Sequence, residues 1–370
     1  MNYKLKELSF HNKGFYGIGA SSCDYNEEYP QYLRITDIDD FGFAPSTLPT
    51  SINPNEYPDW NKYILKENDL LFARTGNSTG RNYLYRHSAK PTVFAGFLIK
   101  FSINPDLILP RYVGYYCQSD HYWNQIRSLF TGSTRANVNA EQYGELQIPV
   151  QSKVIQQHIV NTIGTVDDLI ENLNKQYQKI LDDSLRLFEL FEGSSTIYFS
   201  DAFKSFNGGT FQSKYYVQDS NNKLITIKNV DDAGFNASSV SYLSDERIET
   251  KYLLHPGDVL LTMTGNIGRT GIVDEENCYL NQRVLKLQSK SKLYLLCYLI
   301  KYKQEIIQLG KGTAQLNLSL EDLNNLVVRN TINEIENFAK NDVIFNRLLN
   351  VKLQIKKLRK IKNDLLSKYF

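Results

Sequence analysis

A chain of 370 residues is longer than a single hydrophobic core usually supports, so two or more domains are expected. Its 42 Lys and Arg residues against 40 Asp and Glu residues leave a net charge of +2, which neither requires nor excludes a polyanionic partner. The first ten residues lack the apolar centre of a signal peptide, and the longest apolar run, Leu293–Ile300, is too short to span a bilayer. A cytoplasmic protein is therefore predicted.

The first half of the chain returns in the second half as an internal repeat. Tyr32–Phe43 matches Lys223–Phe235 through a shared Asp-Asp-x-Gly-Phe motif, and each segment is predicted to be a strand that runs into a turn. Tyr63–Arg81 matches Tyr252–Arg269, and in each copy a buried strand leads into a polar, glycine-rich loop.

The third match joins Gly132–Glu141 to Gly312–Glu321. It is followed by a short strand in each copy, Leu146–Val150 or Leu326–Val328, and then by a long helix.

The two long helices are predicted from apolar residues that recur at alternating steps of four and three. The first helix spans Gln151–Phe191, and its seam consists of Ile159, Ile163, Val166, Ile170, Leu173, Tyr177, Ile180, Leu187 and Phe191, interrupted by Ser184. The second seam consists of Ile344, Leu348, Val351, Ile355, Leu358, Leu365 and Tyr369, with Lys362 in one position. Two seams in one chain predict that the helices pair with each other; packing of each helix on its own domain or on a partner protein is the alternative.

These elements predict an α+β protein with a pseudo-twofold internal repeat. It contains two mixed α/β domains, at 1–150 and 193–331, which are separated by two long antiparallel coiled-coil helices at 151–192 and 332–370.

Several fragments resemble catalytic signatures without their context. Phe15–Gly19 has the form of a methyltransferase cofactor loop but follows no clear buried strand, and Asn53–Tyr57 departs from the Asn-Pro-Pro-Tyr motif that holds an extruded adenine. The loops Gly76–Arg81 and Gly265–Arg269 lack the Gly-Lys-Ser/Thr ending of a phosphate-binding loop. The histidines and cysteines show no metal-ligand spacing, so we assign no catalytic residue, cofactor site or metal site, and we expect free thiols.

Polar loops that carry Arg, Thr, Asn and Gln follow the strand ends in both copies. These side chains suit the reading of base edges, because Arg forks onto guanine and Asn or Gln onto adenine. The candidate DNA-binding residues of the first copy are Arg74, Thr75, Asn77, Ser78, Arg81, Arg135 and Asn137. Those of the second copy are Thr262, Thr264, Asn266, Arg269, Gln282, Arg283, Gln315 and Asn317.

Other roles remain open for parts of these segments. The glycines and asparagines can simply close turns, and Asp69 and Asp258 are expected to brace the loops. The lysine-rich stretch Val351–Phe370 is compatible with a solvated coiled-coil face and equally with phosphate contacts.

The order and duplication of these segments resemble the specificity subunit of type I restriction-modification systems. The resemblance covers nearly the whole chain and includes the tandem Thr-Gly-Asn loops, the stretch Leu280–Val284 and the long helix after each copy. The first copy has Phe94–Phe97 where the second has Leu280–Arg283, so base contacts are assigned to this stretch only in the second copy.

The resemblance implies a non-catalytic DNA-recognition subunit whose two target-recognition domains each read one half of a bipartite site. It implies that the helices set the spacer and dock two modification subunits, which bind S-adenosylmethionine, and that restriction subunits join afterwards. This chain itself then holds no cofactor. The alternatives are a self-sufficient DNA methyltransferase or nuclease and a coiled-coil adaptor without a role on DNA.

Overall fold

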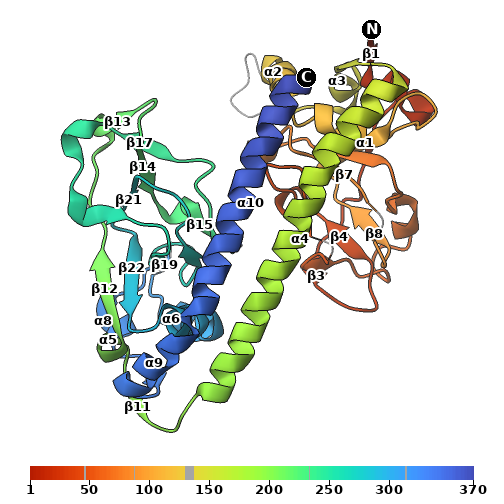
Figure 1. Cartoon of the computed structure of the whole chain (residues 1–370). Helices are drawn as coiled ribbons and strands as arrows, with labels where there is room; N and C mark the ends of the chain where they lie inside the picture. Colours follow the sequence, from red (N-terminus) through yellow and green to blue (C-terminus); the bar gives the residue numbers. More distant parts are fainter. Residues whose placement is uncertain (46, 87, 130–136, 233, 313–314) are drawn as a thin grey trace. The chain divides into compact units, whose positions relative to one another are not determined.

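The computed structural model describes residues 1–45, 47–86, 88–129, 137–232, 234–312 and 315–370 (Figure 1). The chain forms two compact units, the first made of Met1–Leu169 with Leu358–Phe370 and the second of Ile170–Lys357. Helices α4 (Lys153–Phe191) and α10 (Asp342–Tyr369) each contribute residues to both units. Each unit therefore contains one copy of the repeat together with a part of each long helix.

Both repeats build an antiparallel sheet of four strands in the same order. The first is β2 (Phe15–Tyr16), β9 (Leu98–Ser102), β6 (Asp69–Ala73) and β7 (Asn82–Leu84). The second is β12 (Phe203–Asn207), β22 (Val284–Ser289), β19 (Val259–Thr262) and β20 (Thr270–Ile272). The register places Ala73 opposite Leu98 and Thr262 opposite Val284, so corresponding residues of the two copies occupy the same positions.

A second sheet in each repeat contains one parallel pair of strands, β4 with β8 or β14 with β21. In the first repeat its order is β3 (Cys23–Asp24), β5 (Thr50–Ser51), β4 (Gln31–Leu33) and β8 (Thr92–Phe94). In the second repeat it is β13 (Tyr216–Val217), β17 (Ser241–Leu243), β14 (Asn222–Ile225), β21 (Cys278–Leu280) and β18 (Leu253–Leu254). Parallel strands need a long connection, and this connection carries β6 or β19 of the other sheet.

Most of the remaining elements also recur, which confirms the internal repeat. The strand pairs are β1 (Asn2–Lys4) with β10 (Gln147–Pro149), β11 (Thr196–Tyr198) with β23 (Val327–Arg329), and β15 (Val230–Asp231) with β16 (Gly234–Phe235). The helices of the first repeat are α1 (Pro110–Tyr116), α2 (Asp120–Ser128) and α3 (Ala140–Gly144). Those of the second are α5 (Phe199–Ala202), α6 (Lys292–Lys301), α7 (Lys303–Gln308) and α8 (Leu320–Asn324).

The apolar run of strand β6 contributes to two hydrophobic clusters in the first repeat, one on each face of the sheet. Its side chains alternate between the faces of the sheet, so Leu70 and Phe72 join the cluster that contains Tyr143, while Leu71 packs with Phe94 on the other face. A strand that is covered on both faces reads as a nearly continuous apolar run, and the four residues that follow Asp69 in β6 form such a run.

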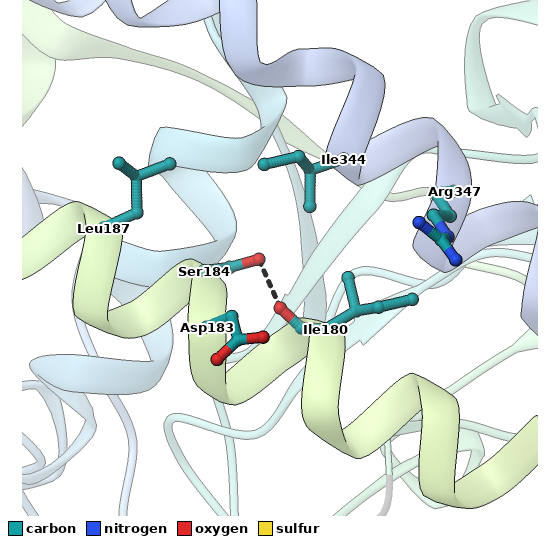
Figure 2. Close-up of a pocket in the computed structure, with 6 residues that line it drawn as sticks. All are labelled: Ile180, Asp183, Ser184, Leu187, Ile344 and Arg347. Carbon is teal, nitrogen blue, oxygen red and sulfur yellow. Dashed lines mark hydrogen bonds between the residues drawn. The ribbon is translucent and has the colours of Figure 1, made fainter.

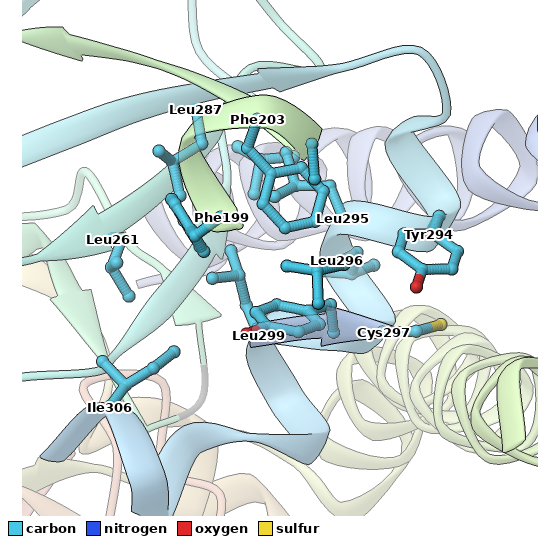
Figure 3. Close-up of a cluster of buried hydrophobic side chains, with 14 of the residues drawn as sticks. Phe199, Phe203, Leu261, Leu287, Tyr294, Leu295, Leu296, Cys297, Leu299 and Ile306 are labelled. Atoms are coloured by element: carbon cyan, nitrogen blue, oxygen red, sulfur yellow. The ribbon is translucent and has the colours of Figure 1, made fainter. Parts of the chain in front are cut away.

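In the second repeat, helix α6 is apolar on nearly all sides because it lies inside the corresponding cluster. Its residues from Leu293 to Leu299 are all buried. Figure 3 shows Tyr294, Leu296 and Leu299 gathered with Phe199 and Phe203, the aromatic residues of α5 and β12.

The long helices pair in an antiparallel manner in the first unit. The Nε2 atom of His158 lies 3.2 Å from the hydroxyl oxygen of Tyr369, and Asp167 lies 2.8 Å from Lys362, so the position in α10 falls as the position in α4 rises. Ile159 and Ile163 share a core cluster with Leu366. The same cluster includes residues of α1 and β6, so α4 packs on its own domain as well as on α10.

The second unit contains the other part of this pairing. Ile180, Ser184 and Leu187 of α4 and Ile344 and Arg347 of α10 line a hollow of about 330 Å³ (Figure 2). The hydroxyl of Ser184 donates to the carbonyl of Ile180 at 2.6 Å, so the polar residue that interrupts the predicted seam is satisfied within its own helix.

The prediction of one continuous helix over 332–370 is wrong. Helix α9 (Ile332–Phe338) ends in a 3-10 turn, Ala339–Asn341, before α10 begins. The carboxylate of Asp342 accepts hydrogen bonds from the hydroxyl of Ser291 and the backbone N–H groups of Lys292 and Leu293 at the start of α6. These contacts at the start of α6 hold the first residue of α10, and with it the turn that separates the two helices.

The lysine in the second seam, Lys362, is buried with 1% of its surface exposed. Its Nζ atom lies 2.8 Å from Asp167, which is itself buried, and 4.8 Å from the ring centre of Phe43. Burial lowers the pKa of Lys362, because a charged ammonium group loses hydration there. This buried ion pair therefore joins the two helices in this unit. Each of its charges is compensated by the other.

We predict that Lys362→Met reduces the free energy of unfolding by about 3–5 kcal/mol, because Asp167 then loses the ammonium group at 2.8 Å, while Arg86 lies farther away, at 4.0 Å. The double variant Asp167→Leu/Lys362→Leu should recover most of this loss, since it removes both buried charges. Denaturant titration of the full chain measures both values. A double variant that is less stable than Lys362→Met would contradict the assignment.

Candidate nucleic-acid interface

Three chain segments meet at the end of the four-stranded sheet in the first unit. The N–H of Arg74 donates to the carbonyl of Phe97 at 3.0 Å, and the N–H of Val138 donates to the carbonyl of Arg74 at 2.9 Å. A β-bridge joins Thr75 to Asn137. Arg74 and Asn137, which are 63 positions apart in the sequence, are thereby held side by side.

The second unit repeats this arrangement bond for bond. The N–H of Met263 donates to the carbonyl of Arg283 at 3.0 Å, and the N–H of Leu318 donates to the carbonyl of Met263 at 2.8 Å. A β-bridge joins Thr264 to Asn317. The three groups of candidates in this copy, found separately in the sequence, therefore form one surface.

Glycines give the loop after β6 or β19 its shape. Gly76 and Gly265 have φ values of +71° and +72°, and Gly80 and Gly268 have φ values of +93° and +80°. These left-handed conformations favour glycine, so the glycines do close turns, as the simpler interpretation of the loops proposed.

Arg81 and Arg269 brace these loops through equivalent ion pairs. Arg81 lies 2.6 Å from Asp40, and Arg269 lies 2.8 Å from Asp232. Both carboxylates belong to the repeated Asp-Asp-x-Gly-Phe motif. Hydrogen bonds from Lys303 and Arg269 lower the pKa of Asp232, so this carboxylate is ionised at neutral pH. The two arginines connect the loop to the motif, and we assign them a positioning role.

The prediction that Thr262 contacts a base is wrong. The residue is completely buried, its hydroxyl donates to the carbonyl of Asn266, and the same oxygen accepts the N–H of Arg269 at 3.0 Å. Thr262 shapes the loop from within. In the first unit Tyr143 has this task, since its hydroxyl donates to the carbonyl of Ala73 and accepts the N–H of Gly80.

Most other candidates are accessible to a ligand. Three are partly exposed: Thr75, Ser78 and Thr264. Seven are fully exposed: Asn77, Asn137, Asn266, Gln282, Arg283, Gln315 and Asn317. Arg135 lies outside the described residues.

Arg74 is held on an aromatic ring that the sequence analysis did not single out. Its guanidinium carbon lies 4.9 Å from the ring centre of Tyr16, and one guanidinium nitrogen lies 3.5 Å from the amide oxygen of Asn137. Tyr16 is fixed in turn, because its hydroxyl accepts the N–H of Ala140 at 3.1 Å. Stacking orients the flat guanidinium group before any ligand arrives.

The sequence analysis assigned no role to two further residues of this surface, Phe97 and Asp40. Phe97 is 60% exposed and occupies the position of Arg283 in the repeat. Asp40, with its counterpart Asp232, fixes the loop arginine. The shared Asp-Asp-x-Gly-Phe motif is the sequence signal that could have identified both acidic residues.

Asp69 and Asp258 were expected to brace the loops that follow the strands, but their contacts lie at the opposite end, at the start of each strand. Asp69 lies 3.1 Å from Lys100, and Asp258 lies 3.4 Å from Lys286, the lysine at the corresponding position of the second sheet. Both pairs are largely buried, so these carboxylates are occupied within the protein.

Much of the basic face of α10 is also used internally. Lys352 pairs with Asp274, Lys356 with Glu275, Arg359 with Asp39 and Lys362 with Asp167. The exposed lysines outside these four pairs are Lys357, Lys360 and Lys368. The interpretation as a solvated coiled-coil face does not account for these four cations, because three of their carboxylates lie outside the long helices and Lys362 is buried. The exposed lysines outside these pairs remain available for phosphate contacts.

Other chemistry finds little support in the described part of the chain. Burial raises the pKa of the Cys278 and Cys297 thiols to about 12, so neither forms a thiolate nucleophile at neutral pH. Within the described residues, His, Cys, Asp and Glu side chains form no group of three that could hold a metal ion. In the same residues, every helix is too short or too polar to cross a membrane.

Each unit thus presents an arginine and exposed amides at the end of a sheet, with Arg74 over the ring of Tyr16 in the first unit and an exposed Arg283 in the second. Side chains of these types suit contacts with nucleic-acid bases. The sequence matches the family model described as type I restriction modification DNA specificity domain over residues 1–182 and 193–363. The chain belongs to this family, and it is a DNA-recognition protein of the specificity-subunit class.

One solved structure shows the same fold, and two others match with lower TM-scores. The crystal structure of a type I restriction-modification S subunit from M. genitalium is 14% identical, with 100% of this chain and 96% of that chain covered and a TM-score of 0.50. An HsdS subunit from Thermoanaerobacter tengcongensis is 16% identical, with 100% and 96% covered and a TM-score of 0.38. A structure from work on assembly of the type I R-M system is 15% identical, with 100% and 97% covered and a TM-score of 0.38. No curated protein matches the sequence.

We predict that Thr262→Val lowers the free energy of unfolding by about 1–2 kcal/mol, because the carbonyl of Asn266 and the N–H of Arg269 lose their buried partner. Thr264→Val is the matched control. Its side chain is partly exposed, and it should change stability by no more than about 0.5 kcal/mol. Denaturant titration measures both variants, and equal losses would show that the buried hydroxyl has no special role.

Proposed function

We propose that this chain is the non-catalytic specificity subunit of a type I restriction-modification complex and that each unit reads one half of a bipartite DNA site. The duplicated surface carries this proposal. The backbone contacts that position the readers are the same in both units, whereas the side chains they present differ. Two readers of different composition recognise two different half-sites.

Base reading is assigned to the exposed polar side chains. Arg74 in the first unit and Arg283 in the second are suited to a forked contact with guanine. The exposed amides, including Asn137, Gln282 and Asn317, are suited to adenine. Exposed lysines such as Lys357 and Lys360 supply contacts to phosphate, which add affinity without sequence preference.

The long helices are assigned two roles in this proposal. As a rigid pair they set the separation of the half-sites, and their outer faces dock two modification subunits, which bring S-adenosylmethionine and methylate adenine. Restriction subunits then join the complex. Val154, Leu190 and Val343 are exposed apolar residues on α4 and α10, a composition that suits protein contacts.

We predict that Arg74→Ala weakens recognition of one half-site by about 1–3 kcal/mol and that Arg283→Ala does the same for the other half-site. Binding of the full chain, with its modification subunit, to duplexes altered in one half measures this effect. Arg74→Lys is the control for charge, since it keeps the cation but loses the fork. Equal loss at both half-sites for either alanine variant would contradict the assignment.

We predict that one heptad inserted after Asn174 in α4, together with one after Gln354 in α10, lengthens the spacer and leaves both half-sites unchanged. A heptad preserves the seam in both helices, so their pairing survives. Sequencing of methylated DNA from cells that express the variant gives the new site. An altered half-site would show that the helices do more than separate the readers.

Catalysis by this chain alone is the competing function. Incubation of the full chain with labelled S-adenosylmethionine and DNA tests it, and methyl transfer without a partner would overturn the non-catalytic assignment. A coiled-coil adaptor without a DNA role predicts no DNA binding even when the modification subunit is present.

A further inference from the structure

In both units an arginine and an apolar residue lie opposite each other just beyond the central strands, but in exchanged positions. The register that pairs Ala73 with Leu98 continues to Arg74 and Phe97, where the N–H of Arg74 donates to the carbonyl of Phe97. In the second unit the register that pairs Thr262 with Val284 continues to Met263 and Arg283, with the equivalent hydrogen bond.

Directly opposed residues of antiparallel strands project from the same face of a sheet. Phe97 therefore lies on the face that carries Arg74, in the place where the second unit presents Arg283. Its counterpart in the exchange, Met263, is only 8% exposed and packs in the core, whereas Phe97 is 60% exposed.

The surroundings of Phe97 distinguish it from an ordinary exposed apolar residue. Single apolar residues on a surface need no explanation. Phe97, however, lies where three segments meet, and Arg74, Thr75 and Asn137 are held at the same junction by backbone contacts. An aromatic ring at this point is positioned against whatever those polar side chains bind.

We propose that Phe97 is a specificity-determining residue of the first unit and that it contacts the 5-methyl group of a thymine in the major groove. The inference rests on the proposed DNA-reading function and specifies one contact within it. The thymine methyl is the apolar group among the base features of the major groove, and phenylalanine offers no hydrogen bond to the others. The first half-site thus contains a methyl-sensitive thymine, while the corresponding position of the second unit is read by Arg283.

The test begins with the bipartite duplex that the full chain and its modification subunit select from a random pool. Each thymine of the first half-site is then replaced singly by deoxyuridine, which removes only the methyl group. We expect one replacement to weaken binding of the wild-type chain about fourfold, the factor that corresponds to burial of one methyl group.

The variant Phe97→Ala should bind the thymine duplex about as weakly as the wild type binds the deoxyuridine duplex, and deoxyuridine should weaken it no further. Phe97→Leu should keep the sensitivity, because an aliphatic side chain still contacts a methyl group. Arg283→Ala is the matched variant of the second unit and should remain sensitive to deoxyuridine in the first half-site. Unchanged binding to the second half-site shows that each Phe97 variant is folded. For Arg283→Ala, the retained sensitivity to deoxyuridine in the first half-site shows that the chain is folded.

A change of preference gives a second readout. Phe97→Arg copies the side chain of the second unit, and selection from a duplex pool randomised at the methyl-sensitive position should shift from thymine towards guanine.

The assignment of Phe97 is overturned if no deoxyuridine replacement weakens binding, or if Phe97→Ala loses affinity equally for both duplexes. A wedge between bases is the competing role for this ring. Increased fluorescence of 2-aminopurine in the first half-site that disappears in Phe97→Ala would establish the wedge and also overturn the methyl contact. If the wild-type complex selects no duplex, the proposed function fails together with this inference.

Discussion

The requirement to bury two apolar helix seams is the constraint on which the rest of the structure depends. In proteins most of the stability of an amphipathic helix comes from packing of its apolar face, so α4 and α10 each need a covering surface. Each unit supplies it from two sources, the other long helix and the core of its own repeat. In the first unit Lys362 and Asp167 add a buried ion pair to this contact, which selects one register of the two helices because neither charge tolerates an apolar neighbour in its place.

The repeated domain separates what is constant from what varies. Its constant part is backbone: the register of β6 with β9 or β19 with β22, the left-handed glycines, and the arginine that pairs with the Asp-Asp-x-Gly-Phe motif. Its variable part is the set of side chains that this backbone presents. The buried support has also diverged, since Tyr143 braces one loop and Thr262 the other. Because main-chain hydrogen bonds maintain this structure, its exposed side chains can be replaced without loss of the fold.

The charged side chains also fall into two groups, those paired within the protein and those presented at its surface. The chain has a net charge of only +2, although its C-terminal helix α10 is basic. Four cations of α10 form ion pairs with acidic groups of the same unit. Composition alone therefore says little about affinity for DNA. The informative charge is local, at the stacked guanidinium of Arg74 and the exposed Arg283, where no carboxylate pairs with either arginine among the described contacts.

The sequence by itself determined the repeat, the long helices, the antiparallel pairing and the glycine-shaped loops, because periodicity and turn chemistry are local properties. It did not reveal that Thr262 is buried, that Asp342 separates α9 from α10, or that Arg81 is bound by Asp40, because burial and partner choice depend on segments far apart in the chain. The tertiary structure alone decided that Phe97 is exposed and lies opposite Arg74, as Arg283 lies opposite Met263. Strand register sets which residues face each other, and register becomes visible only when the strands are paired.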